Sequence, residues 1–216
     1  MKTAETKYYD IAVENEQLYH NSGTQQLLFP GFVRSIPQWF NPWSVIGPGT
    51  GRMQRIGDKI CPRGISIKMY MANKFDRMHT QVRVIVAVLP KVVAGAVTIP
   101  RFDPFQLANS GANGNNMINP PDSDRGIKFL YDRTYILDNM GWVSAPGGGY
   151  AKEPTKYIKL WIKHKGSNVI TYDQGTFDIS ERPLAVYVIP YEQYSTLNTD
   201  NVTSMAGYMR MYYKDV

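Results

Sequence analysis

The side chains best suited to chemistry in this sequence are two groups of basic residues. Residues 51–91 hold nine Lys or Arg against two acidic residues, a local charge of +7. Residues 151–170 hold five Lys against one acidic residue, a local charge of +4. Such groups neutralise phosphate or sulfate charge without reading a base sequence. The net charge of +6 is therefore concentrated in two segments that favour contact with a polyanion.

Both groups adjoin segments in which apolar and polar residues alternate. The first group supplies the candidate polyanion-binding residues Arg52, Arg55, Lys59, Arg63 and Lys68. The second supplies Lys156, Lys159, Lys163 and Lys165, which we interpret as one stripe on the outward face of a strand. Tyr157 and Trp161 lie between these lysines, and stacking combined with charge suits single-stranded nucleic acid. An intersubunit surface or a solvated charged face would use the same residue types, so these alternatives stay open.

Residues for catalysis or metal binding do not form a recognisable set. The three histidines, His20, His79 and His164, are far apart in sequence and have no Cys or carboxylate at ligand spacing. The single cysteine, Cys61, excludes an internal disulfide framework. Neither a phosphate-binding loop nor a G-x-S-x-G motif is present. We therefore expect no catalytic residue, no metal site, no cofactor and no enzymatic activity.

The elements that position the basic residues are predicted to be strands. Period-two alternation or continuous β-rich apolar sequence marks the segments 6–13, 65–72, 80–89, 127–137, 156–165, 168–173, 183–191 and 206–216. Residues 183–191 are apolar at both parities, which predicts a strand buried on both faces. No sustained helical period occurs, and no segment has eighteen consecutive apolar residues. The pattern indicates an all-β sandwich or barrel without membrane insertion.

Large aromatic residues in Gly- and Pro-rich segments are candidates for a subunit interface. A monomer rarely keeps so many large apolar groups exposed in loops. The residues concerned are Trp39, Phe40, Trp43, Trp142 and Tyr150.

The order of these segments resembles the capsid proteins of circovirus-like viruses, which have circular single-stranded DNA genomes and encode a replication initiator. No single motif carries the resemblance, but the ordered set covers most of the chain. It comprises "ETKYYD" (5–10), "GRMQRIGDKICPRGISIKMYM" (51–71), "QVRVIVAVLPK" (81–91), "FLYDRTYIL" (129–137), "KYIKLWIKHKG" (156–166), "PLAVYVIPYEQ" (183–193) and "YMRMYYKDV" (208–216).

The resemblance implies an eight-stranded antiparallel viral jelly roll, in which two four-stranded sheets pack together and carry long surface loops. Residues 1–216 would form one domain. Within it, 1–50 would be an N-terminal extension and extended loop, and 51–216 the core roll with long loops at 91–126 and 139–155. Strands B to I would fall near 63–73, 80–90, 127–132, 133–138, 156–164, 168–173, 183–191 and 205–215.

The same resemblance implies self-assembly into a small icosahedral shell, T=1 with sixty copies, around a circular single-stranded DNA genome. The protein would reside in the virion, with assembly in the host cell nucleus. Residues 1–50 contain only Lys2, Lys7 and Arg34 against four acidic residues, unlike the Arg-rich arm of the family, so we expect weaker genome binding. The lysine stripe also suits a cell-surface sulfated glycan. The alternative function is a non-viral jelly-roll binding module, such as a lectin-like or cytokine-like trimer.

Overall fold

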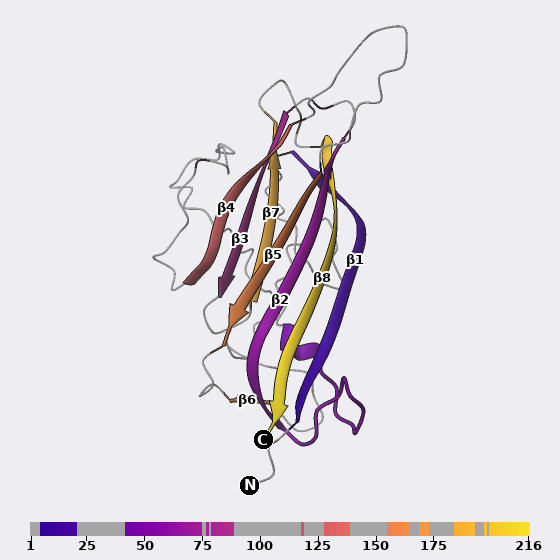
Figure 1. The fold of residues 1–216 in the computed structure, drawn as a ribbon, viewed down its shortest axis with the longest axis vertical. Helices are drawn as coiled ribbons and strands as arrows, with labels where there is room; N and C mark the ends of the chain where they lie inside the picture. The colour runs from indigo at the N-terminus through magenta and orange to yellow at the C-terminus, as the bar shows by residue number, and fades with distance from the viewer. Residues whose placement is uncertain are drawn as a thin grey trace, which may run out of the picture.

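The computed structural model describes residues 5–20, 42–74, 77, 79–88, 118, 128–138, 155–164, 169–172, 184–192, 197 and 199–216. The expectation of an all-β chain is confirmed, because these residues form strands and one short 3-10 helix (Figure 1). In chain order the elements are β1 (Thr6–Tyr19), η1 (Pro42–Val45), β2 (Lys59–Asn73), β3 (His79–Val88), β4 (Lys128–Asp138), β5 (Thr155–Lys163), β6 (Ile170–Thr171), β7 (Leu184–Tyr191) and β8 (Asn201–Asp215).

The strands form two antiparallel sheets. The first has the order β1-β8-β2-β5, with the short β6 also paired to β2. The second has the order β4-β3-β7. Among the described residues the sheets therefore have five and three strands, where four and four were expected.

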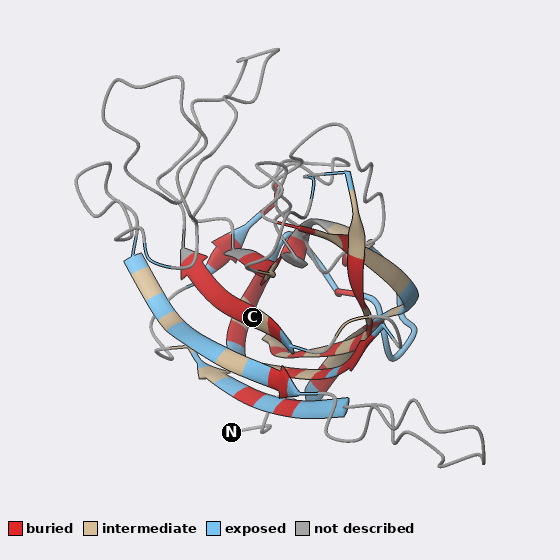
Figure 2. Ribbon diagram, turned by 90° about the horizontal axis from the view of Figure 1, so that it is seen from above, coloured by how far each residue is buried: buried red, intermediate tan, exposed pale blue. Residues whose placement is uncertain are grey.

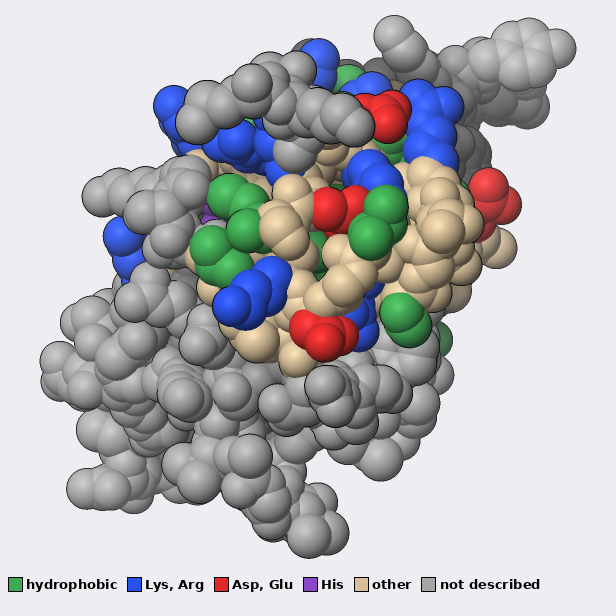
Figure 3. Space-filling view, turned by 90° about the horizontal axis from the view of Figure 1, so that it is seen from below, with side chains coloured by type: hydrophobic (Ala, Val, Ile, Leu, Met, Phe, Trp, Pro, Cys, Tyr) green, Lys and Arg blue, Asp and Glu red, His purple; other side chains and the backbone are tan. Residues whose placement is uncertain are grey.

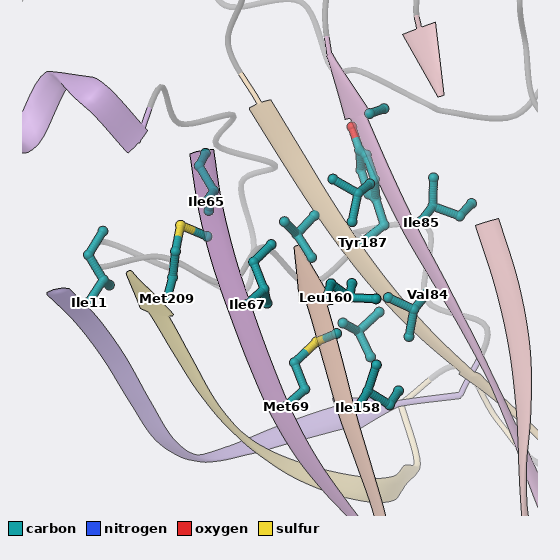
Figure 4. Close-up of a cluster of buried hydrophobic side chains, with 14 of the residues drawn as sticks. Ile11, Ile65, Ile67, Met69, Val84, Ile85, Ile158, Leu160, Tyr187 and Met209 are labelled. Atoms are coloured by element: carbon teal, nitrogen blue, oxygen red, sulfur yellow. The ribbon is translucent and has the colours of Figure 1, made fainter. Parts of the chain in front are cut away.

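The core lies between the two sheets and follows the alternation of the sequence. In β2 one parity is fully buried, namely Ile65, Ile67, Met69 and Met71. Figure 4 shows Ile158 and Leu160 of β5 beside Val84 of β3, across the space between the sheets. The coloring in Figure 2 shows the same alternation of buried and exposed residues along the outer strands.

The second sheet is buried more completely than the first. In β7 the adjacent residues Val186, Tyr187, Val188 and Ile189 are all buried. The prediction of a strand buried on both faces is thus confirmed for this segment. Its partner β3 behaves in the same way, with both Val84 and Ile85 fully buried.

Two expectations about strand boundaries need correction. Residues 128–138 form one strand, β4, and not two strands that meet at 132/133. Asp132 accepts two hydrogen bonds from the guanidinium of Arg83 on β3, at 2.8 and 2.6 Å. This contact joins β4 to β3 in the middle of the strand, so residue 132 continues the strand and does not form a turn. In addition, β1 pairs with β8 along its length, so part of the expected N-terminal extension belongs to the first sheet.

A candidate nucleic-acid interface on the five-stranded sheet

The register of β2 and β5 brings the two basic groups together. Lys68 of β2 lies opposite Lys159 of β5, and Tyr70 lies opposite Tyr157. On its other side Lys68 lies opposite Tyr208 of β8. Alternate residues of a strand share a face, so these side chains all lie on the face directed away from the core. We call this surface the sheet face, and its members on β2 and β5 are Lys68, Tyr70, Tyr157, Lys159, Trp161 and Lys163.

Three aromatic side chains on the sheet face are open to solvent. The exposed fractions are 47% for Tyr70, 58% for Tyr157 and 57% for Trp161. The Trp161 ring lies 5.6 Å from the ring of Tyr212 on β8, centroid to centroid. It also crosses Gly64, where an added Cβ would be 2.5 Å from an indole carbon. The absence of a side chain at Gly64 thus lets the indole lie against the backbone of β2.

Among the described residues, the lysines of the sheet face have no acidic partner. In the part of the chain that the structure describes, no ion pair joins Lys68, Lys159 or Lys163 to a carboxylate. Like charges directly opposite one another on paired strands are unfavourable. A bound anion would relieve this repulsion between Lys68 and Lys159.

Arg210 of β8 differs from these lysines because its charge is balanced. Its guanidinium donates to the carboxylate of Asp10 on β1 at 2.7 and 2.8 Å. Burial by itself would raise the pKa of Asp10. Hydrogen bonds from Arg210 and Tyr208, with the charges of Arg210 and Arg52, nevertheless hold that pKa below its ordinary value. Asp10 therefore stays ionised, and the net positive charge of the sheet face comes from the lysines.

Exposed cations also occur around the edge of the sheet face. The guanidinium of Arg52 lies 4.4 Å from the ring centroid of Tyr8 on β1. Lys59 and Arg63 are exposed at the start of β2. Figure 3 views the molecule from the end that carries the chain termini in Figure 1, and Lys and Arg side chains gather along one edge of that view.

Arg55 is a correction to the predicted set, because it is only 1% exposed. Its side chain donates to the carbonyl oxygens of Ile46, at 3.3 Å, and Gly57, and pairs with Asp58 at 3.2 Å. The guanidinium also stacks 4.0 Å from the ring centroid of Tyr172. Arg55 therefore holds together the segment that precedes β2, and it does not reach a polyanion at the surface.

Lys156 is a second correction, since it does not belong to the stripe. It lies opposite Met71, a core residue, and so takes the inward parity of β5. Its ammonium lies 5.8 Å from the ring centroid of Tyr135 on β4. Lys156 and Lys159 are three residues apart, so the sequence alone indicates that they lie on opposite faces of a strand. Lys165, the last lysine of the predicted stripe, lies outside the described residues.

Trp43 is the third correction, because it is a core residue and not an exposed interface residue. It is 2% exposed, and its carbonyl oxygen accepts a hydrogen bond from the Tyr172 hydroxyl at 2.9 Å. Its ring packs edge-on against His164, 5.5 Å between centroids. The other four predicted interface residues, Trp39, Phe40, Trp142 and Tyr150, lie outside the described residues.

Sequence reasoning did not select Tyr70, Tyr208, Arg210 and Tyr212 for the sheet face. The available signal was the alternation in 65–71 and 206–216, in which these residues alternate with methionines that are buried and so take the outward face of their strands.

Within the described ranges, no three His, Cys, Asp or Glu side chains lie close enough to hold a metal ion. No helix found there is long and apolar enough to cross a membrane.

A scan against protein-family models finds no match for this chain, and a search of curated proteins also finds none.

Proposed function

We propose that this chain is a viral coat protein with a jelly-roll fold, which assembles with copies of itself into a small icosahedral shell. A jelly roll is a long antiparallel hairpin wrapped into two sheets, so strand 1 pairs with 8, 2 with 7, 3 with 6 and 4 with 5. The resulting sheet orders are 1-8-3-6 and 2-7-4-5.

The strand pairing is the observation that carries this proposal. If β1, β2, β3, β4, β5, β7 and β8 are strands 1, 3, 4, 5, 6, 7 and 8, the jelly-roll orders become β1-β8-β2-β5 and β7-β3-β4. These are the orders of the two sheets, apart from the two-residue β6, which pairs with β2 and has no counterpart in the assignment. Strand 2 of the pattern would come between β1 and β2, and residues 21–41 lie outside the described residues. In this assignment the first strand is β1, whereas the family resemblance implied that the roll begins at 63–73.

The resemblance of the ordered segments to circovirus-like capsid proteins supports a structural role and not an enzymatic one. The proposed particle has T=1 symmetry with sixty copies and encloses circular single-stranded DNA. It is the virion shell, and assembly takes place in the host cell nucleus.

The sheet face is the surface proposed to contact the enclosed single strand. Along β5 the outward residues Tyr157, Lys159, Trp161 and Lys163 alternate between aromatic and basic. Successive members are about 7 Å apart, because two residues of a strand span that distance. Bases can stack on the rings while phosphates contact the ammonium groups, as in other sequence-tolerant single-strand sites. A sulfated glycan would use the lysines but gain less from the aromatic rings.

Particle size tests the shell directly. Sixty chains of 24.5 kDa give a particle of about 1.5 MDa, whereas the alternative, a lectin-like or cytokine-like trimer, has a mass of about 74 kDa. Size-exclusion chromatography with negative-stain electron microscopy separates the two outcomes. Closed particles of uniform diameter support the coat protein, and a trimer or monomer at micromolar concentration contradicts it.

A further inference from the structure

A second group of polar side chains lies where the edges of the two sheets meet. Among the described strands, β4 is an edge strand of the second sheet, and β5 is the last strand in the order β1-β8-β2-β5 of the first sheet. The two strands approach each other on the same side of the molecule (Figure 2). Tyr131, Arg133 and Tyr135 lie opposite Val86, Val84 and Val82 of β3. Val84 points toward β5 across the space between the sheets (Figure 4), so these three residues take the inward parity of β4. The inward residues border solvent at this edge, because Arg133 is exposed and both tyrosines are half-buried.

Four side chains make up this group, which we call the seam cluster. The hydroxyl groups of Tyr131 and Tyr135 are hydrogen-bonded to each other. The guanidinium carbon of Arg133 lies 5.6 Å from the ring centroid of Tyr131, and Lys156 of β5 lies 5.8 Å from that of Tyr135. Two cations from different sheets thus flank a pair of touching hydroxyl groups.

The seam cluster has more hydrogen-bond donors than acceptors. One bond between two hydroxyls uses one O–H, which leaves the second O–H free to donate. In the described part of the chain, neither Arg133 nor Lys156 pairs with a carboxylate. The nearest acidic residue in β4, Asp132, has the opposite parity and binds Arg83. Within the described ranges, the cluster therefore offers positive charge and hydrogen-bond donors without an anion to receive them.

Burial and the hydrogen bond with Tyr131 also raise the pKa of Tyr135 to about 12. The phenol of Tyr135 therefore remains protonated at neutral pH, and the hydroxyl pair keeps its donor character.

We propose that the seam cluster binds a tetrahedral oxyanion, a phosphate or sulfate group carried by a larger molecule. Arg133 supplies a planar fork of N–H donors, Lys156 a mobile ammonium, and the tyrosine pair one O–H donor. The competing explanation is that the cations only pack over the aromatic rings. All four residues belong to one chain, so the site does not depend on the proposed shell.

Thermal unfolding in sodium sulfate, compared with sodium chloride at equal ionic strength, tests the site. A ligand that binds the folded chain raises the unfolding midpoint as its concentration increases. We expect the midpoint of the wild type to rise with sulfate, and Arg133→Gln or Lys156→Gln to weaken the apparent sulfate affinity about ten-fold. Lys128→Gln removes an exposed charge from β4 outside the cluster and is the matched control, which should respond like the wild type. An equal sulfate response in the wild type and both cation variants would overturn the proposal.

The double variant Tyr131→Phe/Tyr135→Phe separates the proposed site from ring packing. It keeps both rings and removes both hydroxyls, so it should lower the sulfate affinity, whereas an unchanged affinity would reject the hydroxyls as ligands. Competition by a thymidine 5′-monophosphate probe or by a sulfated disaccharide then identifies the source of the anion. Electron microscopy of each variant is recorded separately, because loss of particles bears on the proposed function and not on this site.

Discussion

The replacement of Lys159 by Gln gives a quantitative test of the proposed nucleic-acid interface. For single strands, the logarithm of the binding constant falls with the logarithm of salt concentration, with a slope of about −0.7 for each phosphate contacted. If Lys68, Lys159 and Lys163 each contact one phosphate, the slope is about −2.1. The affinity should then fall about 18-fold between 50 and 200 mM salt. In Lys159→Gln the slope should be about −1.4 and the loss about 7-fold.

Fluorescence anisotropy with a labelled oligothymidine, measured over a salt series, provides these slopes. Lys74→Gln is the matched control, because Lys74 is exposed directly after β2 and lies outside the sheet face. Trp161→Ala probes the other half of the site. It should weaken binding by about 1–3 kcal/mol at every salt concentration and leave the slope unchanged, because stacking releases no counterions.

Two results would refute this reasoning. A Lys159→Gln slope equal to that of the wild type would mean that the sheet-face lysines do not contact phosphates. Equal affinity for a duplex of the same length would mean that bases do not stack on Trp161, since paired bases are not available for stacking.

Three further predictions concern stability and local geometry. Trp43→Ala should lower the free energy of unfolding by about 3–5 kcal/mol, as measured by chemical denaturation, because a buried indole is removed; unchanged stability with lost assembly would restore the interface interpretation. Gly64→Ala should displace the indole of Trp161 and shift tryptophan emission, and the shift should vanish in a Trp161→Ala background. Burial lowers the pKa of His20, whose Nδ1 accepts the backbone N–H of Glu192, so the folded chain takes up a proton less readily than the unfolded chain. The free energy of unfolding should therefore fall as the pH drops below about 6.5, by at most about 1.4 kcal/mol per pH unit, and a His20→Gln variant with the same pH dependence would contradict this.

The alternation of residues in the sequence was sufficient to predict the strands and most of the core. Ile65, Ile67, Met69 and Met71 were placed on one face by parity, and all four are buried. The apolar character of both parities in 183–191 likewise predicted burial on both faces of β7. These predictions succeed because the direction of a side chain in a strand depends on the adjacent backbone alone. The same alternation, applied to β5, would have placed Lys156 and Lys159 on opposite faces of the strand.

Only the tertiary structure decided which strands are neighbours and which charges are free. Alternation does not specify a partner strand, so the sequence placed Lys68 and Lys159 in separate basic groups, and the pairing of β2 with β5 made them neighbours. Arg55 has the same residue type and local composition as exposed Arg52, yet carbonyl groups and the ring of Tyr172 enclose it. The seam cluster, in the same way, exists because the edges of two sheets meet. Pairing and enclosure depend on contacts between residues that are distant along the chain, and a local pattern carries no information about them.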